Sequence, residues 1–223
     1  GLNAGLYDVV AMDGNGCLGA TQINLSEPPP FTAIINSTDL TCSGNNTGFI
    51  QVVGGGATAP YTYTVIGTNA TGVFAGLAAG NYNITITDVN NCTFDTTQLI
   101  NEPPPLGMIN ALTNTLCFGS ADGQIDVQAS GGTAPYLYSN NNGVILQSSN
   151  VLDGLSAGCY DIYVQDDNGC SLMINECINE PTELTMTIAT SPATCGLNNA
   201  DITVTGANGT PGYNYSNDNG TTF

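Results

Sequence analysis

The sequence predicts an all-β protein made of tandem immunoglobulin-like β-sandwich repeats that form an elongated rod. The first observation behind this prediction is a long internal repeat, because two series of cysteines recur at steps of 75 and 78 residues. The series are Cys17, Cys92, Cys170 and Cys42, Cys117, Cys195. The second observation is that apolar residues alternate with polar ones inside each repeat. The third is that a proline-containing segment ends each repeat.

The repeat divides the chain into four parts, and we expect the chain to be a fragment of a longer protein. These are 1–30, the C-terminal part of a repeat; 31–105 and 106–183, two complete repeats; and 184–223, the N-terminal part of a repeat. The joints read "EPPP" or "EPTE". Proline runs favour extended polyproline II geometry, so short and semi-rigid joints are predicted.

Within a repeat the hydrophobic period is two, which is typical of strands. In "GQIDVQA" the apolar residues Ile125, Val127 and Ala129 alternate with polar ones. A Gly-rich turn and a Tyr-x-Tyr strand follow, and then an alternating strand, a hairpin turn and a last strand. We count about six or seven short strands in each repeat and no segment with helical period, which indicates an immunoglobulin-like sandwich.

The motif Leu-x-x-Gly-x-Tyr stands before one strand of each repeat. It places Gly80 and Tyr82 in the first complete repeat, and Gly158 and Tyr160 in the second. This pattern predicts a tyrosine corner, in which the tyrosine hydroxyl bonds a backbone group just upstream and fixes the crossover between sheets. We therefore give these four residues a structural role.

The charge balance excludes many functions. The chain has 18 Asp and Glu residues, no Lys or Arg and no His, for a net charge of −18. It cannot neutralise nucleic-acid phosphates or attract anionic lipid with a basic face. It also lacks imidazole for acid–base work and lysine for a Schiff base. No apolar run is long enough for a transmembrane helix. We therefore predict a protein that is not an enzyme, has no cofactor and inserts into no membrane.

Calcium is the one metal ligand that the sequence suggests. Asp88 and Asp166 end strands just before a hairpin turn, and Glu102 and Glu180 follow the last strands. Carboxylate oxygens suit Ca²⁺, and a site could form where one repeat meets the next. Asp in such a turn is also an ordinary turn former, and Glu can cap a backbone amide. We favour the second interpretation, because two carboxylates make a weak site.

Eight cysteines and no histidine indicate disulfides in an oxidising compartment rather than zinc. If "DNG" at 167–169 is the turn, Asp166 faces Cys170 and Cys159 faces Cys177 directly across an antiparallel hairpin. We expect a disulfide between Cys159 and Cys177.

The pairing of the other cysteines stays open. Pairing within a repeat would join Cys42 to Cys92 and Cys117 to Cys170, although Cys42 and Cys92 belong to opposite ends of a standard sandwich. Pairing between neighbours would join Cys42 to Cys170 across a joint. A third possibility joins cysteines that are 25 residues apart, such as Cys92 and Cys117.

Taken together, these motifs resemble the SprB-type repeat of Bacteroidetes gliding-motility and cell-surface adhesins. The residues that carry the resemblance are Cys42, Gly48, Ile50, Val52, Gly55, Gly56, Pro60, Tyr61, Tyr63, Leu77, Gly80, Tyr82, Ile84, Ile86, Asp88, Cys92, Glu102 and Pro103. The repeat at 106–183 matches as well. The resemblance implies the stalk of a long secreted adhesin filament on the bacterial cell surface, serving gliding motility or attachment, exported by type IX secretion and held at the outer membrane by other parts.

The resemblance also implies partners. These are neighbouring repeats of the same chain, surface polysaccharide, and the secretion and motility machinery. An alternative function is that the repeats themselves bind glycan or calcium as adhesive modules.

Overall fold

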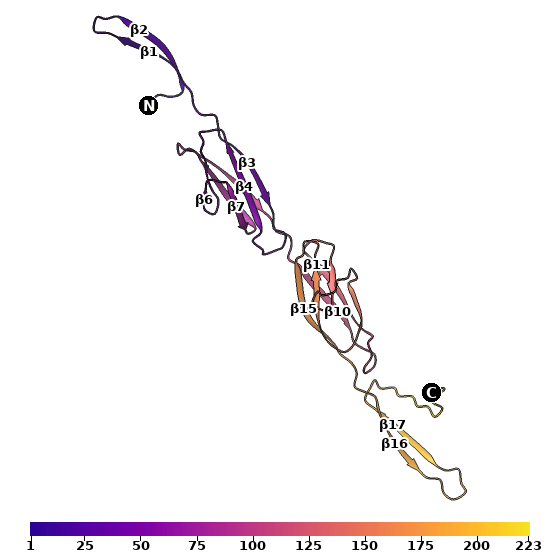
Figure 1. Ribbon diagram of the computed structural model, residues 1–223. Helices are drawn as coiled ribbons and strands as arrows, with labels where there is room; N and C mark the ends of the chain where they lie inside the picture. The colour runs from indigo at the N-terminus through magenta and orange to yellow at the C-terminus, as the bar shows by residue number, and fades with distance from the viewer. The chain divides into compact units, whose positions relative to one another are not determined.

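The computed structural model describes residues 1–223, and all of its regular structure is β-strand, from β1 to β17 (Figure 1). It contains no helix of the length and apolar character needed to cross a membrane. The chain divides into two compact units, Gly1–Glu102 and Pro103–Phe223. Each unit consists of one complete sandwich and one separate hairpin.

The first unit begins with an antiparallel hairpin and continues into a sandwich of two sheets. The hairpin pairs β1 (Gly5–Met12) with β2 (Leu18–Leu25). One sheet of the sandwich has the order β3-β4-β7, with bounds Thr32–Thr38, Gly48–Gly55 and Val73–Leu77. The other has the order β6-β5-β8-β9, with bounds Thr68–Asn69, Thr62–Thr64, Gly80–Thr87 and Thr93–Ile100.

The second unit repeats this sandwich and ends in a hairpin of a different kind. One sheet has the order β10-β11-β13, with bounds Gly107–Thr113, Gly123–Ser130 and Val151–Leu155. The other has the order β12-β14-β15, with bounds Leu137–Ser139, Gly158–Gln165 and Ser171–Ile178. The terminal hairpin pairs β16 (Thr185–Ser191) with β17 (Asp201–Ala207).

All strand pairs are antiparallel. In immunoglobulin terms, β3, β4 and β7 take the places of strands A, B and E, and β5, β8 and β9 those of C, F and G. The predicted all-β class and the immunoglobulin-like sandwich repeated along the chain are therefore confirmed.

The core of each sandwich lies between its two sheets and is built from the residues that alternate along the strands. In the first repeat Ile50 and Val52 of β4 meet Ile84 and Ile86 of β8, all buried. The second repeat uses the same positions, which are Ile125, Val127, Ile162 and Val164. Burial of one face of each sheet explains the period of two in the sequence.

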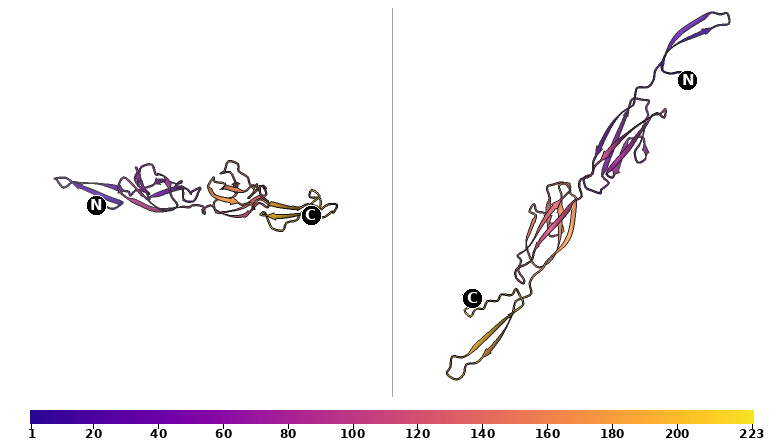
Figure 2. Two further views of the ribbon diagram at one scale, coloured as in Figure 1. Left: turned by 90° about the horizontal axis from the view of Figure 1, so that it is seen from below. Right: turned by 180° about the vertical axis from the view of Figure 1, so that it is seen from behind.

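The two hairpins differ from the sandwiches because no second sheet packs on them (Figure 2). Val9 in β1 occupies the position of Ile84 and Ile162, and Ile202 in β17 occupies that of Ile50 and Ile125. Both Val9 and Ile202 are exposed, whereas their counterparts are fully buried.

Replacing Ile84 by Ala should lower the free energy of unfolding of the first sandwich by about 2–5 kcal/mol, because it leaves a cavity between the sheets. The matched variant Val9→Ala should change stability by less than about 0.5 kcal/mol, because that side chain is already in water. Denaturant titrations followed by circular dichroism measure both. Equal losses in the two variants would contradict the assignment of the core.

Candidate functional site

Tyrosine hydroxyls fix the start of the same strand in the three parts of the chain that contain it. Tyr82 donates to the carbonyl of Ala78 at 2.9 Å, and Tyr160 donates to that of Ser156 at 2.9 Å. Tyr7, at the equivalent position of the first hairpin, donates to Asn3 at 2.8 Å. The donor is always four residues after the acceptor, which is the geometry expected of a tyrosine corner.

Gly80 and Gly158 open the strands that carry these tyrosines. Their φ angles are +150° and +152°, a region that side-chain-bearing residues rarely adopt. A Cβ at either position would have no neighbour within 4 Å. Backbone conformation rather than lack of space therefore selects glycine at the corner.

Aspartates organise the hairpin turns. In the second repeat Asp166 Oδ1 accepts from the backbone N–H of Asn168 and Cys170, at 3.0 and 2.8 Å. Its Oδ2 accepts from the N–H of Thr133, at 2.9 Å, in the Gly-rich loop before the Tyr-x-Tyr strand. Asp88 makes the same three kinds of bond in the first repeat. Each aspartate thus closes its own turn and ties it to a second loop at the same end of the sandwich.

Glutamates act at the opposite end. Glu102 accepts from the backbone N–H of Gly44 at 2.7 Å, and Glu180 accepts from that of Gly119 at 2.7 Å. Nowhere in the chain do three or more Asp, Glu, Cys or His side chains gather as a metal site would require. The carboxylates raised as calcium ligands therefore accept hydrogen bonds from backbone N–H groups.

Each resolved shift moves a pKa further away from neutral pH. Hydrogen bonds from the backbone N–H and side-chain amide of Asn101 lower the pKa of Asp39. The hydroxyl of Ser120 and the N–H of Leu116 lower the pKa of Asp122. Burial raises the pKa of Tyr138. A general acid or base works best with a pKa near the working pH, so these shifts point to structural bonds rather than to proton transfer.

The cysteines show where sequence reasoning succeeded and where it failed. Cys159 and Cys177 face each other in the β14–β15 register and form a disulfide with an S–S distance of 2.03 Å. The within-repeat pairings are wrong, because Cys92 and Cys117 are exposed free thiols. The pairing of cysteines 25 residues apart is wrong for the same reason.

The physical reason is the length of the sandwich. Cys42 follows β3, at the end where Gly44 binds Glu102, whereas Cys92 follows the β8–β9 turn, at the other end. The eight residues of β8 separate these ends by roughly 25 Å at about 3.3 Å per residue. A disulfide needs Cα atoms within about 7 Å.

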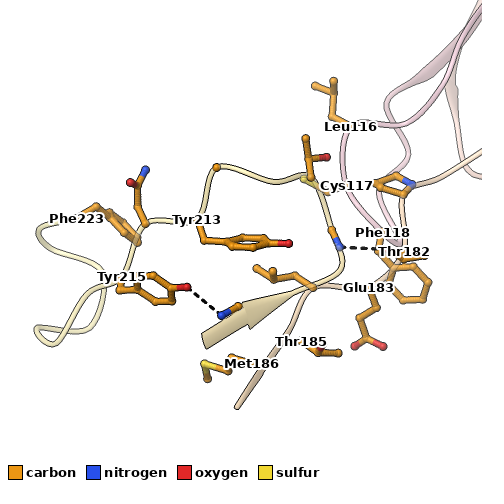
Figure 3. Close-up of a pocket in the computed structure, with 17 residues that line it drawn as sticks. Leu116, Cys117, Phe118, Thr182, Glu183, Thr185, Met186, Tyr213, Tyr215 and Phe223 are labelled. Carbon is orange, nitrogen blue, oxygen red and sulfur yellow. Dashed lines mark hydrogen bonds between the residues drawn. The ribbon is translucent and has the colours of Figure 1, made fainter. Parts of the chain in front are cut away.

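A pocket at the end of the second unit was missed by the sequence reasoning (Figure 3). It has a volume of about 870 Å³. Apolar side chains that line it include Leu184, Met186, Tyr213, Tyr215 and Phe223. All five belong to the incomplete repeat at 184–223, and Leu116, Cys117 and Phe118 of the preceding sandwich line the pocket as well. The signal that could have revealed the pocket is that residues 184–223 contain only part of a repeat.

Comparison with known proteins supports the resemblance seen in the sequence. The family model described as the SprB repeat matches residues 34–70 and 109–144, once in each complete sandwich. Both matches lie in the parts of the chain where the motifs predicted SprB-type repeats. A search of curated proteins found no match.

Among solved structures, the chain is similar to a C-terminal 282-residue fragment of intimin, determined in complex with the intimin-binding domain of the translocated intimin receptor. The identity is 14% and the TM-score is 0.39. The similarity covers 71% of this chain and 66% of the intimin fragment.

Calcium should contribute little to stability, because the carboxylates of Asp88, Asp166, Glu102 and Glu180 already accept backbone hydrogen bonds. Thermal melts in chelator and in millimolar calcium should agree within a few degrees. A large rise in melting temperature with calcium would contradict this and would establish a cation site.

The Cys159–Cys177 disulfide closes a loop of 18 residues, and replacing both cysteines by Ser should cost up to about 3 kcal/mol in the second repeat. Asn81 and Leu99 face each other in the same register of the first repeat, so the double variant Asn81→Ser/Leu99→Ser is a matched control. Denaturant unfolding of both variants measures the difference. A loss no larger than in the control would show that the disulfide adds nothing.

Proposed function

We propose that this chain is a segment of the stalk of a secreted cell-surface adhesin, in which each sandwich serves as a spacer. The observation that carries the proposal is that two complete repeats build the same core, corner and turn caps from corresponding residues. The two matches to the SprB repeat model support an adhesin-type structural role at the cell surface. Gliding motility or attachment, type IX export and anchoring at the outer membrane by other parts are the finer points of this proposal.

The proposed stalk consists of the four parts 1–30, 31–105, 106–183 and 184–223, with neighbouring repeats as each other's main partners. Surface polysaccharide and the secretion and motility machinery are the partners proposed for the whole filament. The polar groups described above support a spacer rather than an enzyme or a binding module, because their hydrogen bonds go to backbone and side-chain groups of the same repeat.

The joint inside the second unit supports a stiff connection. Glu180 binds the N–H of Gly119 in the sandwich that the chain leaves, at 2.7 Å. Two residues later, the carbonyl of Thr182 accepts from the N–H of Gly209 in the repeat that the chain enters, at 3.0 Å. The joint therefore leaves little free chain between two anchored residues, which suits a filament that must hold its tip at a distance.

Pairing of Cys42 with Cys170 stays a proposal for the stalk. Within its own repeat, Cys42 lies at the end that Glu102 closes, where the chain leaves. Within its own repeat, Cys170 follows the Asp166 turn, at the end where the chain enters. Non-reducing peptide mapping with a protease other than trypsin tests it, because the chain has no Lys or Arg. A Cys42–Cys92 peptide would overturn it.

Small-angle scattering of the chain at low concentration tests the proposed stalk. A repeat with strands and turns of about ten residues spans roughly 35 Å at about 3.3 Å per residue, so a maximum dimension above roughly 100 Å is expected. A compact particle of the same mass would contradict a stalk.

A further inference from the structure

The two complete repeats share a core but differ on the outer face of one sheet. In the second repeat this sheet is β12-β14-β15, and its outward positions include Leu137, Tyr163 and Met173, since residues next to them in each strand pack in the core. The first repeat has short polar residues at the same positions, which are Thr62, Thr85 and Asp95. The core therefore does not require an apolar outer face.

The second repeat also has a longer loop beside this face. In the first repeat, the paired residues Tyr63 and Asn69 have five residues between them. In the second repeat, the equivalent pair Tyr138 and Gln147 has eight. The longer loop contains three consecutive apolar residues, 144–146, and Val144 and Ile145 are 80% and 69% exposed.

The loop lies against the outer face of the sheet. Gly143 has a φ of +76°, and a Cβ added to it would lie 3.0 Å from Cε1 of Tyr163. The backbone N–H of Asn142 donates to the carbonyl of Asp161, on the same strand as Tyr163, at 3.4 Å. These contacts place the apolar run beside Tyr163. We call the resulting surface the apolar patch, made of Leu137, Val144, Ile145, Tyr163 and Met173.

Hydrogen bonds within the loop hold this surface in shape. Ser139 Oγ accepts from the N–H groups of Asn141 and Gly143 at 3.1 and 3.2 Å. Asn141 Oδ1 accepts from the N–H of Ile145 at 3.0 Å. Because the loop uses these polar groups internally, it presents apolar side chains to solvent. A surface that is formed before binding loses little conformational freedom when a partner binds.

The loop also determines how a partner can approach. The backbone groups of Gln147 pair with those of Tyr138 at 2.8 and 2.9 Å, so the loop covers part of the outer edge of β12. A partner that extends the sheet would need this edge to be open. Contact with the outer face remains, and exposed apolar patches of this kind are typical of interaction sites.

Charge selects the partner. The chain has 18 Asp and Glu residues and no Lys or Arg, so it repels a second copy of itself and any anionic polymer. Asp161 lies two residues before Tyr163 on β14 and therefore on the same face. Its Oδ1 accepts from the side-chain amide of Asn175 at 2.9 Å, which leaves Oδ2 for a cation.

From the patch, its fixed loop and the charge beside it, we infer that this face of the second repeat is a docking surface for a segment of another protein that carries apolar side chains flanked by Lys or Arg. The apolar side chains cover Ile145, Tyr163 and Met173, and a cation reaches Asp161. This role goes beyond that of a spacer and does not depend on the length of the stalk. The first repeat, with its polar face, lacks it.

The test is binding of short labelled peptides to the 223-residue chain, measured by fluorescence anisotropy at physiological ionic strength, where the Debye length is about 8 Å. A peptide of Leu and Lys should bind. A peptide of Leu and Glu should bind at least about tenfold more weakly, because it is repelled by the net charge of −18. A peptide of Ser and Lys should also bind at least about tenfold more weakly, because it has nothing to place on the patch.

Two matched variants locate the binding face. Ile145→Ser should weaken binding of the Leu and Lys peptide about tenfold, because it removes a large part of the apolar contact. Ile109→Ser is the control, since Ile109 is also 69% exposed but lies on β10 of the other sheet. It should change the affinity by less than about twofold.

Further variants separate lost docking from misfolding. Leu137→Thr and Tyr163→Thr introduce the residues that the first repeat has at these positions, so the sandwich should still fold, as circular dichroism can verify. The double variant should bind the Leu and Lys peptide at least about tenfold more weakly. Asp161→Asn should weaken binding by up to about fivefold, and this difference should vanish at high salt.

Several results would count against the inference. Equal losses in Ile145→Ser and Ile109→Ser would mean that the peptide is held by general charge attraction alone. Equal affinity for the Leu and Glu peptide would remove the argument from charge. Light scattering that shows a dimer of the unmodified chain but not of Ile145→Ser would make a second copy the occupant. Tighter binding of dextran, a neutral polysaccharide, than of the Leu and Lys peptide would replace the protein partner by a glycan.

Discussion

The contact between two sheets is the constraint on which the rest of this structure depends. A strand with alternating apolar residues leaves its apolar face in water until a second sheet covers that face. Ile50 and Ile84 are fully buried because they face each other across that contact. The same strands without an opposite sheet, β1–β2 and β16–β17, leave the equivalent positions in water. Repetition along the chain therefore means that each repeat supplies both halves of its own core.

The hydrogen bonds at the two ends of a sandwich hold these sheets in place without any cation. A chain that lacks Lys, Arg and His cannot pair its carboxylates with opposite charges. Asp166 and Glu180 instead accept from backbone N–H groups, which form charge-assisted bonds with carboxylates at the loop ends. The acidic composition thus has a structural use, since carboxylates close turns and fasten joints while their charge keeps the surface soluble.

The structural use of these carboxylates also bears on function. The titratable side chains with resolved shifts are held by hydrogen bonds or by burial that move their pKa values away from neutrality. The proposed stalk follows from one fact, that a repeat is a pair of complementary sheets.

Sequence alone determined the class of fold, the strand register and the corners. A period of two together with a short "DNG" turn leaves one register, and that register places Cys159 opposite Cys177. The local motif around Gly158 and Tyr160 likewise needs only a few neighbouring residues. These features are local, so the nearby sequence contains all the information that they require.

Tertiary structure decided what depends on distance across the sandwich. The sequence could not exclude a bond between Cys42 and Cys92, because only the folded repeat separates their loops by the full length of β8. It also could not show that Ile202 and Tyr215 are exposed, because their pattern is that of core residues. Their burial depends on a second sheet, which residues 184–223 do not contain. An apolar pattern tells which face a strand must bury, but the sheet that buries it is supplied by another part of the sequence.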